Sequence, residues 1–257
     1  MKWELKSYNE DYLTSKSSEF GESKLISRLL LNRGINTKEK VQKFLNSDKK
    51  DIHNPFLFED MENAVKRIQK AGKNKEKIII YGDYDVDGIS GVAYLVIMLR
   101  RLGLNVDYYI PNRVHKGTGI NKHVLAFLKK WDAKLFITVD TSINNLEEMM
   151  LLKDRGIDII ITDHHRKTGI SENEEKNLGV LTINPKSSKN YPNKFLSGSG
   201  VAFKLADAIY EAYGANKKIL YDYLDIIMIG TVADVVPMTD ENRFIIKKGL
   251  NNLKKTK

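Results

Sequence analysis

The sequence predicts an α/β fold in which a mainly parallel β-sheet is flanked by helices, preceded by a small helical N-terminal extension. From about residue 75, short runs rich in Ile and Val alternate with segments of helical periodicity, which is the rhythm of parallel sheets. These runs are continuously apolar, as is typical of strands covered on both faces. Before them, apolar residues recur only at helical spacing.

The N-terminal extension, residues 1–74, is predicted to consist of helices. The leucine-rich segment 25–34 has helical spacing and ends in Asn-Arg-Gly, a stop signal. Thr37 is placed to cap a second helix that continues to residue 45, and a third helix is predicted over residues 60–71.

The α/β domain is predicted to span residues 75–240. Its expected strands are residues 77–81, 106–110, 135–139, 158–162 and 180–183. Its expected helices are residues 88–102, 122–130, 146–155 and 200–213. The polar segment 166–178 predicts a surface loop, and residues 241–257 predict a basic helix that begins a connector.

The composition limits what the chain can be. Its 257 residues suffice to bury a core, and the absence of cysteine excludes disulfides, zinc–cysteine sites and thiol chemistry. No apolar run reaches the roughly 18 residues of a membrane span, and the start lacks a signal-peptide core, so we expect a cytoplasmic protein without a membrane partner. The net charge of +9 favours a phosphate-bearing partner, although a Lys-rich composition explains it equally well.

Acidic residues and histidines follow the ends of predicted strands and of one later apolar run. They are Asp83, Asp85, Asp87, Asp140, Asp163, His164, His165 and Asp234. The first three occupy alternate positions and share one side if the strand geometry continues. Ligands of open α/β sheets bind outside the carboxyl ends of the strands, so we expect these side chains to converge. Clustered carboxylates repel unless a cation neutralises them, and carboxylates with imidazole suit Mn²⁺ or Mg²⁺.

Other interpretations of single residues stay open. The D-x-D-x-D-G pattern also begins EF-hand calcium loops, but the twelfth position is Tyr94, not Glu, and the preceding segment is strand-like. Asp83 or Asp87 alone could cap a helix, and a lone histidine is more often a core residue than a ligand. Four segments that all deliver such residues favour a metal site.

These motifs resemble those of the DHH phosphoesterases, in the form typical of RecJ-type single-stranded-DNA exonucleases. Residues 163–165 are similar to the motif that names the family, and residues 82–88, 139–140 and 230–237 are similar to its first, second and fourth motifs. Linking segments at residues 33–35, 51–56, 109–113 and 198–205 are similar too, so the resemblance covers nearly the whole chain. The chain departs from the family at Ser142 and Thr118, where Gly and Tyr are usual.

The resemblance implies a site for two divalent cations, Mn²⁺ or Mg²⁺. Asp85 would bind one metal and Asp87 the other, and Asp140 would bridge both. His164 and Asp234 would complete the second site.

The remaining candidates would act around these metals. Asp83 would ligate the first metal or orient a water, His165 would face the phosphate, and Asp163 would orient a histidine. The candidate substrate contacts are Ser90, Arg113 and Lys116.

The function implied is metal-dependent hydrolysis of phosphodiester bonds, degrading single-stranded DNA from the 5′ end to mononucleotides in DNA repair and recombination. A helicase or a single-strand-binding protein is a candidate partner, and the oligomeric state stays open. One alternative is a DHH phosphodiesterase acting on short oligonucleotides or cyclic dinucleotides, and another is a non-catalytic scaffold, which the complete ligand set argues against. Because the family normally continues into a second domain, a truncated form that is inactive without that domain is a further alternative.

Overall fold

A computed structural model describes residues 6–111, 122–141, 146–166 and 171–254. Arg113, Lys116, Thr118 and Ser142 therefore lie outside the described residues. The chain divides into two compact units, Met1–Asp51 and Ile52–Lys257.

This division falls before α4 (Met61–Lys73), whereas the sequence placed the boundary after it, at residue 74. The difference arises because α4 buries one apolar face, including Met61, Val65 and Ile68, in the core of the larger unit.

The smaller unit contains three helices, α1 (Glu10–Phe20), α2 (Lys24–Asn32) and α3 (Lys38–Leu45). The side chain of Thr37 accepts a hydrogen bond from the amide of Lys40, which is the predicted N-cap. The unit has its own core, formed by Leu13, Phe20, Leu30, Leu31 and Val41. Two 3₁₀ turns, η1 (Lys49–Asp51) and η2 (Pro55–Leu57), follow on either side of the division.

The larger unit is built on five parallel strands in the order β2-β1-β3-β4-β5. They are β1 (Lys77–Gly82), β2 (Val106–Tyr109), β3 (Ala133–Val139), β4 (Asp158–Thr162) and β5 (Leu181–Ile183), and the α/β prediction is confirmed. Gly82 pairs with Val139, and Val139 pairs with Thr162, so β1, β3 and β4 end level with one another. The strand order reverses between β1 and β3, which is where sheets of this order bind ligands.

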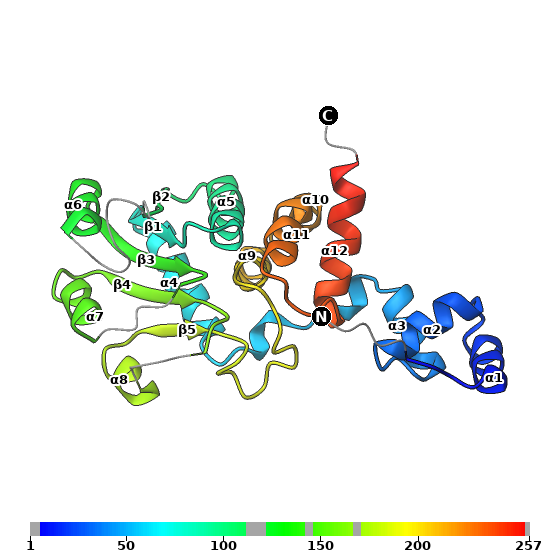
Figure 1. The fold of residues 1–257 in the computed structure, drawn as a ribbon. Helices are drawn as coiled ribbons and strands as arrows, with labels where there is room; N and C mark the ends of the chain where they lie inside the picture. Colours follow the sequence, from blue (N-terminus) through cyan, green and yellow to red (C-terminus); the bar gives the residue numbers. More distant parts are fainter. Residues whose placement is uncertain (1–5, 112–121, 142–145, 167–170, 255–257) are drawn as a thin grey trace. The chain divides into compact units, whose positions relative to one another are not determined.

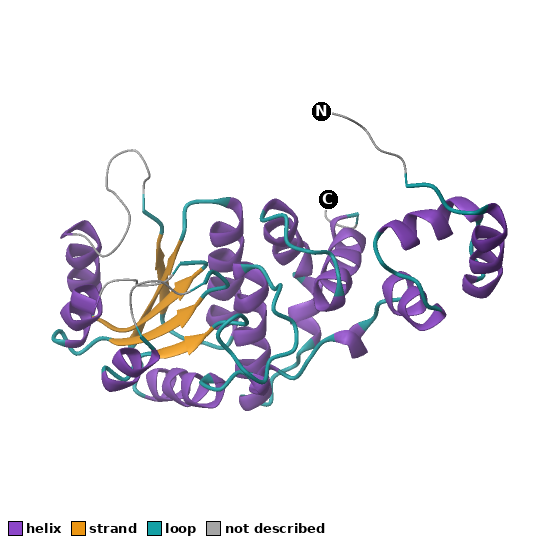
Figure 2. Ribbon diagram, turned by 60° about the horizontal axis from the view of Figure 1, so that its bottom comes forward, coloured by secondary structure: helices purple, strands orange, loops and turns teal. Residues whose placement is uncertain are grey.

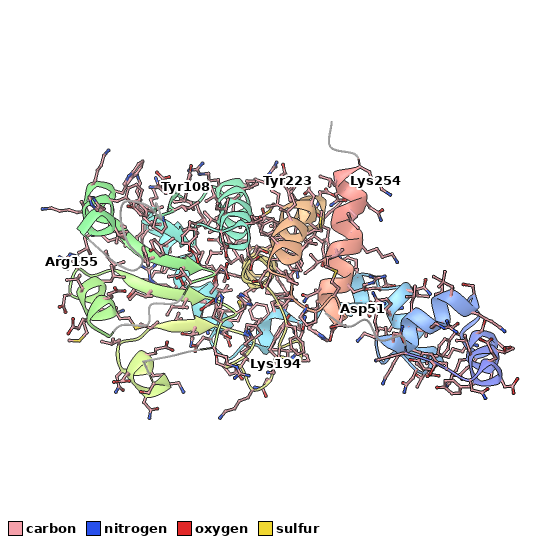
Figure 3. The ribbon with its side chains drawn as sticks, in the orientation of Figure 1. Asp51, Tyr108, Arg155, Lys194, Tyr223 and Lys254 are labelled. Atoms are coloured by element: carbon pink, nitrogen blue, oxygen red, sulfur yellow. The ribbon has the colours of Figure 1, made fainter. Side chains whose placement is uncertain are left out.

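Helices cover both faces of the sheet (Figures 1 and 2). On one face, α6 (Lys122–Trp131) and α7 (Leu146–Lys153) pack against alternate strand residues that include Ile79, Phe136 and Ile159. On the other face, α4, α5 (Val86–Arg101) and α9 (Gly198–Ala212) pack against the intervening strand residues. Side chains fill the space between these layers (Figure 3). The continuous apolar runs therefore have the predicted cause, burial on both faces.

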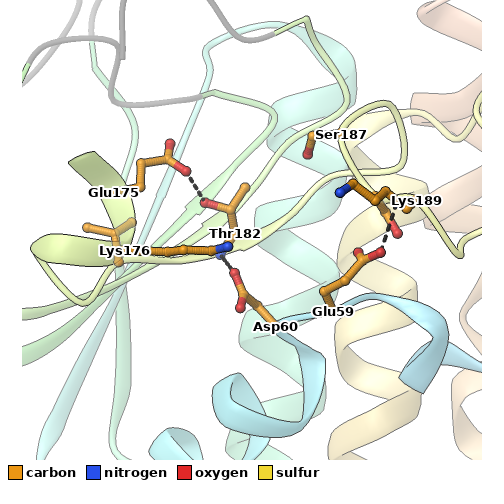
Figure 4. Close-up of a pocket in the computed structure, with 9 residues that line it drawn as sticks. Glu59, Asp60, Glu175, Lys176, Thr182, Ser187 and Lys189 are labelled. Atoms are coloured by element: carbon orange, nitrogen blue, oxygen red, sulfur yellow. Dashed lines mark hydrogen bonds between the residues drawn. The ribbon is translucent and has the colours of Figure 1, made fainter. Parts of the chain in front are cut away.

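The free edge of β5 is covered by carboxylates. Asp60 accepts a hydrogen bond from the amide of Thr182 at 2.9 Å, and Glu175 accepts one from the Thr182 hydroxyl at 3.0 Å (Figure 4). Glu175 lies in α8 (Glu172–Asn177), so the predicted loop over residues 166–178 is wrong for these six residues. Ser171 and Glu174 form a capping box, the local signal for this helix. The carboxylates occupy polar groups that an edge strand otherwise exposes.

A further helical layer packs on α5 and α9. It consists of α10 (Lys218–Asp222), α11 (Leu224–Ala233) and α12 (Asp240–Leu253). The buried pair of Lys204 and Glu241, 2.9 Å apart, joins α9 to the start of α12. Glu241 also accepts hydrogen bonds from the His53 amide at 3.0 Å and the Tyr191 hydroxyl at 2.6 Å. In the described part of the chain, no helix is long and apolar enough to cross a membrane.

Candidate metal centre

The first acidic motif bends from a strand into a helix. β1 ends at Gly82 and α5 begins at Val86, two residues before the expected start, so the strand geometry does not continue through the three aspartates and they do not share one side of a strand. Asp85 instead caps α5, accepting a hydrogen bond from the Gly88 amide at 2.9 Å, and its side chain is exposed. Asp87 lies in the first helical turn and is 2% exposed. Asp83 stays beside the sheet, where its amide donates to the Val139 carbonyl at 3.3 Å.

The N-terminus of α9 holds the carboxylate of Asp87. The Gly198 amide donates to Asp87 Oδ2 at 2.6 Å, and the Ser199 amide donates to Oδ1 at 3.1 Å. The Ser199 hydroxyl donates to the same Oδ1. A helix N-terminus favours negative charge, so α9 both orients and stabilises this buried carboxylate.

Asp140 follows β3 in a left-handed conformation, with φ at 57°. Its amide donates to the Thr162 carbonyl at 3.0 Å, which continues the strand pairing for one more residue. A Cβ atom added to Gly198 would lie 2.4 Å from Oδ1 of Asp140, so only glycine allows α9 to approach this closely.

The DHH segment follows β4 and turns around Asp163. Oδ1 of Asp163 accepts hydrogen bonds from the amides of His164, at 2.7 Å, and His165, at 3.2 Å, and lies 2.8 Å from His165 Nδ1. The side-chain amide of Asn184, just after β5, donates to the His165 carbonyl at 2.8 Å. Asp163 thus holds the backbone of both histidines and the side chain of His165.

Four buried or half-buried side chains from different elements converge at this edge. His164 Nε2 lies 3.2 Å from Asp140 Oδ1 and 3.5 Å from Asp234 Oδ2. Ligand atoms of Asp87, His164 and Asp234 lie within 4.8 Å of one another, as do those of Asp140, His164 and His165. Asp234 reaches this place from the C-terminal end of α11, so the apolar run that the sequence placed before it is a helix.

Burial shapes the charge state of the carboxylates. It raises the pKa of Asp140 to about 10, with further increases from the carboxylates of Asp87 and Asp85. Burial also raises the pKa of Asp234, while the neighbouring His164 acts to lower it. Ionisation of these carboxylates is therefore unfavourable unless a cation lies beside them.

The pKa values of the two histidines shift in opposite directions. Burial lowers the pKa of His164, which leaves a neutral imidazole, the form that binds metals. The hydrogen bond to Asp163 raises the pKa of His165 to about 9, so its ring carries a proton near pH 7. Burial acts to raise the pKa of Asp163, but the hydrogen bonds from His165 outweigh it and the net shift is downward.

These groups fit a divalent cation. Within the described residues, several of their buried polar atoms have no hydrogen-bond partner: Asp140 Oδ1, Asp234 Oδ2 and both ring nitrogens of His164. Orphaned buried atoms of this kind cost free energy unless a further group satisfies them, and oxygen and imidazole ligands suit Mn²⁺ or Mg²⁺.

The other sequence candidates lie around this cluster. Asp83 and Asp85 belong to neither close group found among the described residues, although the charge of Asp85 acts on Asp140. Ser90 is buried on α5, one turn after Asp87.

Sequence reasoning did not assign a site role to Gly198, Ser199 or Asn184. The first two lie in a small-residue segment behind a serine cap, at a helix start, so a signal was present. Nothing near Asn184 in the sequence distinguishes it from an ordinary turn residue.

The sheet and the carboxylate–histidine cluster at its edge define an α/β protein with a candidate centre for divalent metals. Residues 77–231 match the DHH family, N-terminal domain, which is more than half of the chain, and the chain belongs to this family.

Individual relatives extend the similarity to nearly the whole sequence. The single-stranded-DNA-specific exonuclease RecJ of Bacillus subtilis (strain 168) is 37% identical over 256 residues, which are 100% of this chain and 31% of that protein. The crystal structure of RecJ in complex with Mn²⁺ from Thermus thermophilus matches with a TM-score of 0.77 and 26% identity, over 98% of this chain and 35% of that one.

A crystal structure of exonuclease RecJ bound to manganese has a TM-score of 0.67 and 32% identity, over 78% of this chain and 49% of that chain. The resemblance stated from the motifs is thereby confirmed. This chain spans about a third of the length of the Bacillus subtilis relative.

Proposed function

We propose that this chain carries the phosphodiester-hydrolysing centre of a RecJ-type exonuclease, which degrades single-stranded DNA from the 5′ end to mononucleotides. The observation that carries the proposal is the convergence of Asp87, Asp140, His164 and Asp234, with buried ligand atoms that lack partners among the described residues. Its support is the identity to RecJ across the whole chain and the metal in the matching RecJ structures.

In this proposal two Mn²⁺ or Mg²⁺ ions occupy the cluster. Asp87, His164 and Asp234 would hold one ion, Asp85 with Asp83 beside it would hold the other, and Asp140 would contribute to both sites. Bound there, the ions supply Lewis-acid activation of water and offset the charge that develops on the phosphate.

The protein's own residues orient and complete this chemistry. The α9 N-terminus holds Asp87 in one direction through its backbone donors. His165 is exposed, protonated and held at Nδ1 by Asp163, so its Nε2 is free to donate a hydrogen bond to a phosphate oxygen of the substrate. Asp163 is a positioning residue for this histidine.

The cellular role and the partners are proposed from the same family. A cytoplasmic role in DNA repair and recombination, with a helicase or single-strand-binding protein as partner, is proposed from the RecJ relatives and from the net charge of +9. Ser90, Arg113 and Lys116 stay proposed substrate contacts.

The proposal is tested with purified chain, Mn²⁺ and single-stranded DNA labelled at either end. We expect mononucleotides released from the 5′ end, abolished by EDTA and reduced at least about 1,000-fold by Asp140→Ala, because a shared metal ligand is lost. Asp154→Ala, which removes an exposed carboxylate from the end of α7, is the matched control and should retain full activity.

Calorimetric titration with Mn²⁺ separates the alternatives. Turnover confined to short oligonucleotides or cyclic dinucleotides would replace the substrate in the proposal. Tight Mn²⁺ binding without any turnover would show that a second domain is required for hydrolysis. If the unchanged chain does not bind Mn²⁺, the proposal is wrong.

A further inference from the structure

A recess with basic walls lies beside the metal centre. It has a volume of about 430 Å³ and is lined by Arg166, Lys186, Ser187, Lys194 and Phe195. We call it the basic recess. None of these residues belongs to the metal cluster, and none was singled out from the sequence.

The basic recess is built from two segments that contact the metal centre, the one that follows His165 and the one that runs from Asn184 to Gly198. Arg166 directly follows His165, and Asn184 ties this segment to the opposite wall. The Asn184 side chain donates to the His165 carbonyl at 2.8 Å and accepts from the Lys186 amide at 2.8 Å. The wall that contains Phe195 runs within three residues into Gly198, whose amide holds Asp87.

The cations of the basic recess are available to a ligand. Arg166 and Lys186 are exposed, and their side chains make no hydrogen bond or ion pair with any residue that the structure describes. Lys194 is half-buried and donates to the Ser188 carbonyl, which fixes its ammonium group in the wall. Positive charge here offsets the repulsion that the neighbouring carboxylates exert on an approaching phosphate.

Phe195 presents an aromatic ring at the same place. The residue is 53% exposed. Its backbone is held on both sides, since its amide donates to Asn193 Oδ1 at 3.0 Å and its carbonyl accepts from Asn242 Nδ2 at 2.6 Å. An exposed ring on a fixed backbone beside free cations is the combination that binds single-stranded nucleic acid, with a base on the ring and phosphates on the cations.

We propose that the basic recess binds the nucleotides of single-stranded DNA next to the scissile phosphate, with Arg166, Lys186 and Lys194 contacting phosphates and Phe195 stacking on a base. The inference rests on the proposed function and assigns the substrate path to this side of the centre.

The test measures the binding of a fluorescent single-stranded oligonucleotide by anisotropy, in EDTA to prevent turnover, over a range of salt concentrations. The double variant Arg166→Ala/Lys186→Ala should bind at least 10-fold more weakly. The slope of log affinity against log salt should fall by about 1.4, because two phosphate contacts at about 0.7 each are lost. Phe195→Ala should weaken binding by about 5- to 100-fold with an unchanged slope, and Phe195→Trp should restore binding, because stacking needs a ring and not a charge.

A matched control removes the same charge elsewhere. Lys129→Ala/Arg155→Ala takes two cations from the opposite end of the sheet, where Arg155 is labelled in Figure 3, and should bind DNA with the affinity and slope of the unchanged chain. Mn²⁺ titration of each recess variant reports whether its metal centre has formed.

The outcomes separate this inference from the proposed function. DNA binding that is equal in the unchanged chain and the recess variants, or reduced equally by the control variant, overturns the inference and leaves the metal centre untouched. If the unchanged chain shows Mn²⁺-dependent hydrolysis and the recess variants lose no DNA affinity, the inference is also overturned and the proposed function stands. An unchanged chain that neither binds nor hydrolyses single-stranded DNA overturns both.

Discussion

At the scale of single residues, Asp140 has an environment that disfavours its ionised form, although the ionised form is the one that binds a metal. It is 2% exposed, has a left-handed backbone and lies near the carboxylates of Asp85 and Asp87. A buried group surrounded by like charge is costly to ionise, and such groups cluster at functional sites. A cation bound beside Asp140 would offset this cost, so the proposed metal role accounts for a buried carboxylate that the metal-free fold disfavours.

A pH dependence of stability follows for the metal-free chain. The pKa of Asp140 is about 10 in the folded chain against an ordinary value of 3.8, so between these values the folded chain holds a proton that the unfolded chain has lost. This contribution to the free energy of unfolding is complete below about pH 4 and is lost as the pH rises toward 10. Asp140→Asn should therefore be more stable than the unchanged chain in EDTA at pH 8, raising the melting temperature by about 2–4 °C per kcal/mol gained.

Thermal unfolding followed by circular dichroism at pH 6 and pH 8 measures this difference. The advantage of Asp140→Asn should grow with pH in EDTA and reverse with Mn²⁺, which stabilises only the chain that binds it. An advantage independent of both pH and metal would contradict the assignment, and Asp154→Asn is the control for loss of an exposed carboxylate.

At the scale of elements, two helix N-termini meet at the carboxyl edge of the sheet. α5 begins within the first acidic motif, and α9 directs its first amides at Asp87. The approach depends on glycine, because a Cβ atom on Gly198 would lie 2.4 Å from Asp140 Oδ1 and one on Gly230 would lie 2.6 Å from Asp87 Oδ1. Small residues thus set how closely α9 and α11 approach the ligands.

A pair of alanine substitutions on α9 tests this role. Gly198→Ala should destabilise the chain by about 1–3 kcal/mol through overpacking and weaken Mn²⁺ binding at least 10-fold, because the methyl group displaces Asp140. At Gly200 the nearest atom to an added Cβ is Leu196 Cδ2 at 3.2 Å, a flexible side-chain end, so Gly200→Ala should change stability by less than about 1 kcal/mol.

Urea unfolding and Mn²⁺ calorimetry compare the two variants. Equal metal affinities in Gly198→Ala and Gly200→Ala would show that the close approach of α9 is not needed for the site.

Local sequence patterns predicted the strands and most of the long helices, because β1, β3 and β4 are largely apolar runs and helices such as α4 and α9 carry a clear apolar face or cap. They misplaced the start of α5, since the acidic motif reads equally as strand or helix cap, and its Asp85 proved to be the cap. Asp234 could be chosen from its motif, but its position depends on how α11 packs against α5, which no local pattern encodes. Asn184 acts through a contact across the sheet edge with His165, and such contacts appear only after folding.

At the scale of the whole molecule, the core of the larger unit and the candidate metal centre are built within Ile52–Lys257. Every residue of the candidate metal cluster comes from this unit. The ion pair of Lys204 and Glu241, which joins α9 to α12, also lies within it. The smaller unit has a separate apolar core of five buried residues. A unit of this size buries a smaller fraction of its surface than a large domain does and is only marginally stable.

Residues 52–257 expressed alone should therefore fold cooperatively and bind Mn²⁺ within about twofold of the affinity of the full chain, because a site built inside one unit does not depend on the other. Urea unfolding of the full chain should show an early transition of small amplitude for residues 1–51, which the shortened chain lacks, and a common main transition. Far-ultraviolet circular dichroism measures both transitions, and Asp140→Ala in the shortened chain is the control for specific metal binding. A shortened chain that is unfolded, or folded with Mn²⁺ affinity reduced more than about tenfold, would show that the N-terminal residues contribute to the centre, contrary to the division into two independent units.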